Sequence, residues 1–195
     1  MKLRFNVLLA VMLLASCNRG AEEFSKSRPA DSPQAPLSDK ASPTSEADLN
    51  AVRDFVEAFY NWYVPVAAGR GTRRPSDLAL EDRPSIFDPS LAAQLREDSA
   101  AQAKVSDDIV GLDFDPFLFA QDPCARYEIV NGHRNAENYL IDVRGVGGCE
   151  KHDQTDVIAE VASRNGALLF VNFHYPGPDE SDLMTLLKKL KADRK

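Results

Sequence analysis

The chain has 195 residues and a formal net charge of −7 at pH 7, and 44% of its residues are hydrophobic. The acidic balance excludes a general affinity for nucleic acid, which requires a cationic surface. This length is enough for one domain with a real hydrophobic core in addition to terminal segments.

The N-terminus combines a short positive segment with a short apolar run. Lys2 and Arg4 precede residues 5–14, which only Asn6 interrupts with a polar side chain. A run of about ten residues is too short to cross a hydrocarbon core of about 30 Å, but it is typical of a secretory signal. Because residues 14–17, Leu-Ala-Ser-Cys, resemble the bacterial lipobox, we expect a lipoprotein signal peptide over residues 1–16 and lipidation of Cys17. An ordinary secretory signal with an incidental cysteine is the alternative.

Cleavage before Cys17 removes Lys2 and Arg4 and moves the net charge from −7 to −9. Acyl chains on Cys17, palmitate among them, then hold the protein on a membrane, because each buried methylene contributes about 0.8 kcal/mol. Asn18 rather than Asp follows the cysteine. Under the sorting rule of enteric bacteria, Asn18 favours the periplasmic face of the outer membrane.

A Pro- and Ser-rich segment separates Cys17 from the rest of the chain. It is poor in apolar side chains, with Phe24 and Leu37 as exceptions, so it cannot offset its ordering entropy by burial. We expect residues 17–45 to form a disordered tether that reaches roughly 30 Å on average. Residues 46–195 are then one domain.

The first predicted helix follows Ser45, a candidate N-cap with Asp48 three residues later. Pro65 is expected to end it, and a long loop with Gly69, Gly71 and Pro75 follows. A second helix is expected from Asp88-Pro89 to about Lys104. Apolar residues of the first helix recur every three or four positions: Leu49, Val52, Phe55, Val56, Phe59, Tyr60 and Tyr63.

Beyond residue 124 the pattern changes to strands, expected over residues 125–130, 138–146, 156–162 and 168–175. Asn131-Gly132 and Asn165-Gly166 are hairpin signals between them. A closing helix carries Leu183, Leu186, Leu187 and Leu190 on one side. Helices followed by a strand meander indicate an α+β fold, with N-terminal helices packed on a curved antiparallel sheet of about four strands and a closing C-terminal helix.

Two short motifs carry a family resemblance. Residues 112–117 read Leu-Asp-Phe-Asp-Pro-Phe, and residues 121–123 read Gln-Asp-Pro, after an aromatic run at residues 59–63. This pattern resembles an uncharacterised bacterial domain family of small exported proteins, often lipoproteins. Over most of residues 46–190 the resemblance implies a nuclear-transport-factor-like or cystatin-like cone, in which a curved sheet wraps helices around a pocket. It implies a fold rather than an activity.

The motif places Asp113, Asp115, Gln121 and Asp122 within a short segment. Oxygen side chains in one loop can bind a hard cation such as calcium, but the glycine and distal glutamate of an EF-hand are absent. The simpler interpretation is structural: Asp115-Pro116 caps a short turn and Asp122-Pro123 ends it. Three neighbouring aromatic residues would then be core wedges: Phe114, Phe117 and Phe119.

Cys124 and Cys149 are the cysteines left after Cys17, and an oxidising compartment favours their pairing. Such a disulfide closes about 26 residues and stabilises the fold by roughly 3–4 kcal/mol. A metal site with His152 is the rival interpretation, although it lacks an evident fourth ligand. Unpaired thiols are the third.

The remaining candidates are histidines and basic clusters. His133 is expected to be exposed, whereas His174 ends the last strand, where its ring can face the cone interior and serve as a base beside a carboxylate. A packed or exposed imidazole is the simpler interpretation. The basic clusters are expected to be solvated, although either suits anionic lipid headgroups or an acidic protein: Arg70, Arg73 and Arg74, and Lys188, Lys189, Lys191, Arg194 and Lys195.

No nucleophile elbow, Walker loop, dinucleotide fingerprint or His-Glu-x-x-His pattern occurs, so the sequence predicts no cofactor, no metal and no catalytic constellation. Our leading hypothesis is a non-enzymatic envelope module that binds a protein partner or supports an assembly. A small-molecule binder or an isomerase- or hydrolase-type enzyme would need an open cone pocket with a His174–carboxylate pair. An inhibitor or immunity protein would be favoured by an exposed acidic loop.

Overall fold

The computed structural model describes residues 43–69, 71–149, 154–177 and 181–194. Outside the described residues lie the expected signal peptide, Cys17, the expected tether up to residue 42, Arg70, His152 and Lys195.

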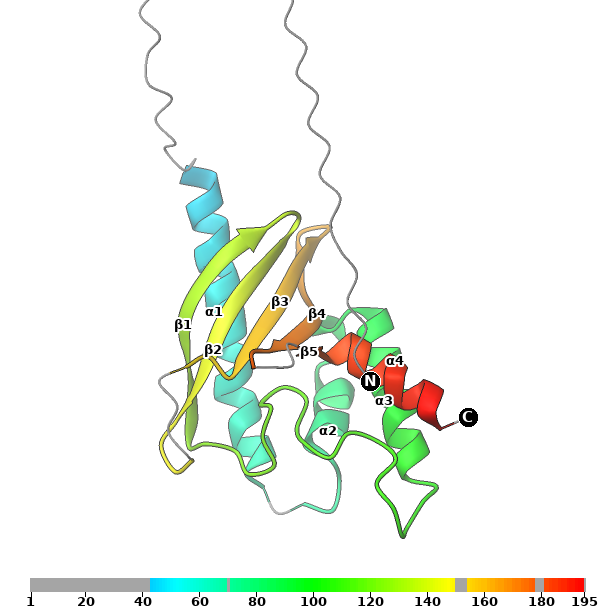
Figure 1. Cartoon of the computed structure of the whole chain (residues 1–195). Helices are drawn as coiled ribbons and strands as arrows, with labels where there is room; N and C mark the ends of the chain where they lie inside the picture. The colour runs from blue at the N-terminus through cyan, green and yellow to red at the C-terminus, as the bar shows by residue number, and fades with distance from the viewer. Residues whose placement is uncertain (1–42, 70, 150–153, 178–180, 195) are drawn as a thin grey trace, which may run out of the picture. The chain divides into compact units, whose positions relative to one another are not determined.

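The helices and strands form an α+β fold, which is the class that we expected (Figure 1). The helices are α1 (Pro43–Ala67), α2 (Pro75–Asp82), the 3-10 helix η1 (Pro84–Ile86), α3 (Pro89–Gln102) and α4 (Leu183–Asp193). The strands are β1 (Arg126–Asn135), β2 (Asn138–Val146), β3 (Val157–Arg164), β4 (Ala167–Tyr175) and β5 (Ser181–Asp182).

Helix α1 is longer than predicted at both ends. It begins at Pro43, before the predicted N-cap Ser45, because a proline fits the first turn, where its missing N–H has no intrahelical partner. Pro65 does not end the helix either: it lies in the last turn, and the Ala68 N–H still bonds the Val64 carbonyl at 2.9 Å. Within the described part of the chain, no helix combines the length and apolarity that a membrane span requires.

The long loop predicted after Pro65 contains a helix that sequence periodicity did not reveal. Helix α2 has only 8 residues, too few for a clear repeat, although Pro75 marks its start and Ala79 and Leu80 are buried. The prediction for α3 is confirmed at its start, where the Asp88 carboxylate accepts from the Ser90 N–H at 2.8 Å. Helix α3 ends at Gln102, two residues before the predicted end.

The sheet is antiparallel in the order β1-β2-β3-β4-β5. The Asn165-Gly166 turn is confirmed, with φ of 54° and 79° in the left-handed region that this hairpin requires. The predicted turn at Asn131-Gly132 is wrong, because β1 continues to Asn135 and the turn falls at residues 136–137. Gly132 serves close packing instead: a Cβ there would lie 2.7 Å from Ile141 Cδ1 and 3.3 Å from Arg53 Nε of α1.

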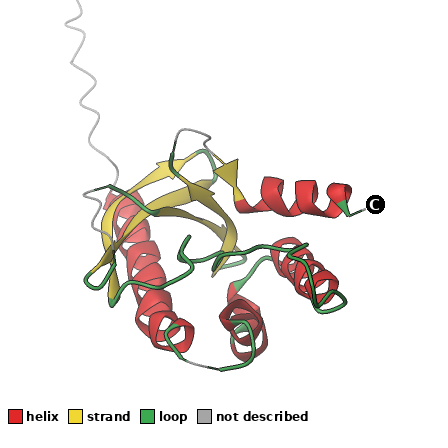
Figure 2. Cartoon of the chain, turned by 60° about the horizontal axis from the view of Figure 1, so that its bottom comes forward, coloured by secondary structure: helices red, strands yellow, loops and turns green. Residues whose placement is uncertain are grey.

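Register shifts curve the sheet around the helices. They fall between Ile129 and Asn131 on β1 and beside Glu160 and Val161 on β3, and such bulges bend and twist a strand. Figure 2 shows the curved strands above α1, α2 and α3, with α4 extending from the β5 end. The fifth strand, β5, is only two residues long and was not predicted.

The concave side of the sheet is filled by aromatic rings. Phe59 of α1 lies at the centre, with its ring centroid 4.8 Å from that of Phe170, 5.2 Å from that of Tyr63 and 5.6 Å from that of Phe117. All four side chains are at most 1% exposed. The interior is therefore a packed core, so the residues that carry chemistry must be sought at the surface.

Candidate functional site

Residues 112–123, here called the motif loop, are held in place by three tyrosines of the core. Tyr60 Oη donates to the Phe117 carbonyl at 2.8 Å, and Tyr175 Oη donates to the Pro116 carbonyl at 2.8 Å. Tyr63 Oη donates to the Asp115 carboxylate at 2.6 Å. Burial raises the pKa of all three hydroxyls well above its ordinary value, so they remain donors at neutral pH.

Asp115 organises the turn inside the motif loop. Its Oδ1 accepts from the backbone N–H groups of Phe117 at 2.9 Å and Leu118 at 3.2 Å, and its own N–H bonds the Ala120 carbonyl at 2.8 Å. Burial raises the pKa of Asp115 to about 6, even though the hydrogen bonds from Tyr63 and the two amides lower it. The structural interpretation of Asp115 as a cap is therefore the one that the geometry supports.

The other motif side chains do not converge with Asp115 on a cation site. Asp113 and Asp122 are exposed, and the Gln121 amide donates to the Asp113 carbonyl oxygen at 3.3 Å. Among the described residues, no group of three or more His, Cys, Asp or Glu side chains is placed to hold a metal ion.

The three phenylalanines predicted to be core wedges differ in how deeply they are buried. Phe117 is fully buried, and Phe114 is partly buried against the core. Phe119 is 43% exposed, so its prediction as a core wedge is wrong. Its backbone has a φ of 49°, which turns its ring outward onto Tyr175, with ring centroids 4.4 Å apart.

The motif loop forms one wall of a surface pocket of about 570 Å³, here called the motif pocket. The end of α1, the start of α2 and the loop after α3 supply the other walls. The motif thus brings Asp113, Asp115 and Gln121 to one pocket, whereas Asp122 does not line it. The side chains around the pocket include Arg73, Arg74, Gln102, Ile109, Asp113, Phe114, Asp115 and Gln121.

Arg74 at the pocket belongs to a buried charge network that sequence reasoning missed. The Asp98 carboxylate of α3 is 1% exposed and accepts from Arg194 Nη1 at 2.8 Å and from the Leu112 N–H at 3.0 Å. Arg74 Nη1 lies 3.6 Å from Asp98, and Arg74 also bonds the Leu112 carbonyl. The signal was present, because Asp98 follows Leu91 and Leu95 at helical spacing on the buried face, where a carboxylate needs a partner.

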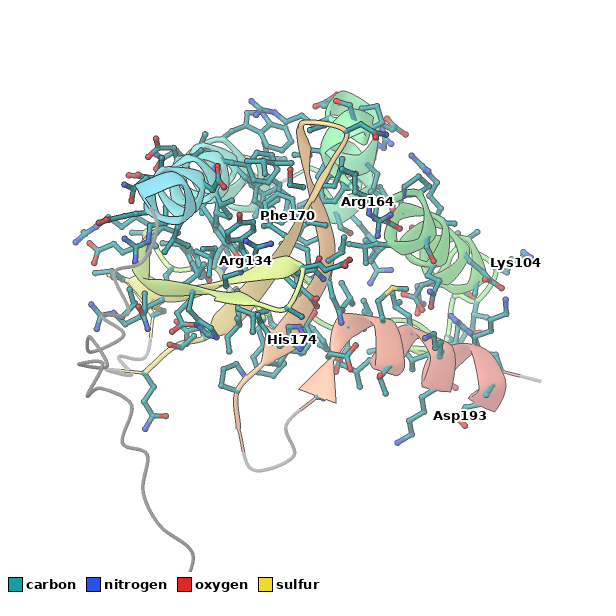
Figure 3. All side chains as sticks on the ribbon, turned by 90° about the horizontal axis from the view of Figure 1, so that it is seen from above. Lys104, Arg134, Arg164, Phe170, His174 and Asp193 are labelled. Carbon is teal, nitrogen blue, oxygen red and sulfur yellow. A yellow bond between two sulfur atoms is a disulfide. The ribbon has the colours of Figure 1, made fainter. Side chains whose placement is uncertain are left out.

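The two basic clusters separate into solvated and structural members. Arg73 forms an exposed ion pair with Glu81, and Lys191 forms one with Glu97 at 2.8 Å. Lys188 and Lys189 are exposed. Arg194, in contrast, is only 17% exposed and joins α4 to α3, whose C-terminal ends lie side by side near Lys104 and Asp193 (Figure 3). For Arg74 and Arg194 the solvated interpretation is wrong.

His174 lies on the sheet face opposite the core. Phe173 and Tyr175 point inward, so the strand alternation turns His174 outward; Figure 3 shows it across the ribbon from Phe170. The expectation that His174 faces the interior is therefore wrong. Its Nε2 lies 2.9 Å from a Glu160 oxygen, a partner that sequence spacing did not identify. The shallow pocket beside it measures about 340 Å³. His133 is exposed as predicted, although it lies within β1.

Cys124 and Cys149 form the expected disulfide, which connects the end of the motif loop to the segment after β2. Because both sulfurs are joined, neither supplies a free thiolate for the metal site considered with His152. Gly145 makes room for the bridge: a Cβ at this position would lie 2.3 Å from Cys124 Sγ. The disulfide thus fixes the motif loop at one end while the tyrosines fix its turn.

Comparisons with known proteins find a structural neighbour whose function is unknown. No family model and no curated protein matches the chain. The crystal structure of a protein of unknown function from Bacteroides thetaiotaomicron is similar, with a TM-score of 0.48 and 19% sequence identity. The match covers 67% of this chain and 93% of that one.

Proposed function

We infer that this chain is a lipid-anchored protein of the bacterial cell envelope whose folded domain binds a partner protein. The lipobox at Cys17 and the apolar run before it support the anchor. One observation carries the binding role: the motif pocket is walled by a loop that three buried tyrosine hydroxyls and a disulfide hold in place. A surface fixed before binding loses less conformational entropy when a partner docks.

A non-enzymatic role is supported by the surroundings of His174. Enzymes of the kind considered above need an open cavity, but aromatic rings fill the concave side of the sheet. Glu160, the partner of His174, also accepts from the Asn138 amide at 2.6 Å. In the described part of the chain, no hydroxyl or thiol is hydrogen-bonded to His174. The pair therefore lacks an adjacent nucleophile.

The motif pocket lies at the C-terminal end of α1. The tether joins the domain at the N-terminal end of α1, whereas Ala67 at the other end lines the motif pocket. A helix of 25 residues is about 37 Å long. The length of α1 therefore separates the pocket from the start of the folded domain, while Asn18 after the lipidated cysteine supports an outer-membrane anchor and a partner in the periplasm.

A specific observation favours inhibition as a second candidate function. Residues 104–110, here called the acidic loop, project beyond α3 and carry Asp107, Asp108 and the 67% exposed side chain of Ile109 (Figure 1). A protruding acidic loop with an apolar tip is suited to plug a cationic cleft. This candidate uses the same surface, so both functions depend on the same residues.

The anchor is tested by metabolic labelling with a palmitate analogue. The chain should take up the label and remain with membranes after a high-salt wash, and Cys17→Ser should abolish both. Labelling that persists in Cys17→Ser, or a chain that is cleaved and released to the periplasm without lipid, contradicts the anchor.

The binding role is tested by a photo-crosslinking amino acid placed at Ile109 in living cells. We expect one specific adduct, identified by mass spectrometry. A probe at Val130 is the matched control, because this residue is also apolar and 50% exposed but lies on β1. No specific adduct at Ile109, or the same adducts at both positions, contradicts a binding surface at the motif pocket.

A further inference from the structure

The charges around the motif pocket favour a cationic ligand. Among the described residues, no cation is paired with Asp107, Asp108 or Asp113. Asp115, half-buried in the pocket wall, is hydrogen-bonded to neutral donors. Asp113 and Asp115 line the pocket, whereas Asp107 and Asp108 precede the lining residue Ile109 in the acidic loop.

The nearby arginines do not cancel this negative charge. Arg73 is already paired with Glu81. Arg74 is bound to the Leu112 carbonyl and lies beside Asp98, which Arg194 shares. This network retains one positive charge, whereas two carboxylates line the pocket and two more lie in the acidic loop, which also carries Lys104.

The apolar part of the surface is fixed as firmly as the charged part. Ile109 is 67% exposed and lines the pocket, while Gln102 clamps the backbone on both sides of it. Gln102 Oε1 accepts from the N–H groups of Val110 at 2.9 Å and Gly111 at 3.0 Å, and its Nε2 donates to the Asp108 carbonyl at 3.0 Å. Because this backbone is already ordered, little conformational entropy is lost when a partner packs on Ile109.

We propose that the partner presents a basic segment, in which a lysine or arginine enters the motif pocket toward Asp113 and Asp115 while an adjacent apolar side chain packs on Ile109. This inference rests on the proposed function and names the chemistry of its partner. Complementary charge steers the encounter of two proteins and disfavours acidic competitors.

The test uses the full chain carrying Cys17→Ser and fluorescently labelled synthetic peptides, with binding measured by anisotropy. The first peptide mixes lysine and leucine; a second replaces lysine by glutamate, and a third replaces leucine by serine. We expect the lysine–leucine peptide to bind at least about tenfold more tightly than the glutamate peptide, with an affinity that falls as salt rises. The serine peptide should bind more weakly than the lysine–leucine peptide.

Substitutions in the protein test whether the lysine–leucine peptide binds at the motif pocket. Asp113→Asn and Ile109→Ser should each weaken the lysine–leucine peptide by about two- to fivefold, the range expected for one exposed contact. Glu137→Gln is the matched control, because Glu137 is exposed in the β1–β2 turn, remote in sequence from the pocket, and it should change nothing. Equal binding of the glutamate peptide, or binding that both pocket variants leave intact, overturns the proposal.

The outcomes separate this inference from the proposed function. If the crosslinker at Ile109 traps a partner whose contact surface is acidic or uncharged, the basic-segment proposal fails while the binding role stands. If the crosslinker at Ile109 traps no partner, the binding role fails as well.

Discussion

The motif pocket and the outer face around His174 both place acidic and basic side chains together, but they hold them differently. Asp115 lines the pocket half-buried, Asp98 is buried beside it, and each accepts hydrogen bonds from more than one part of the chain. On the outer face, His174 and Glu160 meet on adjacent strands and remain 36% and 20% exposed. Burial makes the carboxylates of Asp98 and Asp115 essential to the local structure. Exposure to solvent leaves the His174–Glu160 pair only a small contribution to the free energy of unfolding.

The largest expected effect comes from removing the carboxylate of Asp98. Asp98→Ala leaves Arg194, Arg74 and the Leu112 N–H without their shared acceptor, and breaking a buried pair costs about 3–5 kcal/mol. Urea unfolding should show this loss in the free energy of unfolding. Two variants at the C-terminal end of α4 form a matched pair: Arg194→Ala should be strongly destabilising, whereas Lys191→Ala removes an exposed ion pair worth less than about 1 kcal/mol.

Equal effects of Arg194→Ala and Lys191→Ala would contradict the role of Asp98 as a buried partner of Arg194.

The second largest effect is expected from removing the disulfide. Replacing both Cys124 and Cys149 by alanine should lower the free energy of unfolding by about 3–4 kcal/mol, because the unfolded chain regains the freedom of the closed segment. Weaker peptide binding should accompany this loss, since the motif loop is no longer fixed at its end. A double variant that unfolds at the same urea concentration as the parent would contradict this role.

Asp115 should give the fold a pH dependence. The pKa of Asp115 is raised from 3.8 to about 6 by burial, so the protonated form is favoured in the folded state. Its stabilising contribution is present below about pH 4 and is lost as pH rises through about 6, amounting to roughly 3 kcal/mol. The groups that face this carboxyl are Tyr60, Tyr63, Tyr175 and Arg74.

Asp115→Asn should flatten the pH profile of the free energy of unfolding between about pH 4 and 6, the interval set by the two pKa values. A slope that Asp115→Asn preserves would assign the pH dependence to another group.

The smallest effect is expected on the outer face. His174→Gln should change the free energy of unfolding by less than about 1 kcal/mol, because the pair with Glu160 is partly exposed. Thermal unfolding is sufficient to measure it. A loss as large as that of Asp98→Ala would erase the difference between the two regions.

Sequence patterns predicted most elements because their signals are local. The apolar repeat of α1, the Asp88-Pro89 start of α3 and the Asn165-Gly166 turn each depend on a few neighbouring residues. The Asn131-Gly132 error has a tertiary cause, since Gly132 is needed for the approach of α1 rather than for a turn.

The site was harder to predict, because its members come together only in the folded chain. The motif residues Asp113, Asp115 and Gln121 were identified, but their meeting with Arg74 and Ile109 depends on α2 and the acidic loop. Asp98 could have been found as a carboxylate on an apolar helix face. The pairing of His174 with Glu160 depends on strand register, which the sequence does not specify.

The most direct test of the binding role is the affinity of the partner trapped at Ile109 for the full-length parent and two full-length variants. The double variant that combines Ile109→Ser and Asp113→Asn should weaken binding by about tenfold, whereas His174→Gln should leave it unchanged. Binding that the pocket variants leave intact but His174→Gln abolishes would place the functional surface on the outer face of the sheet.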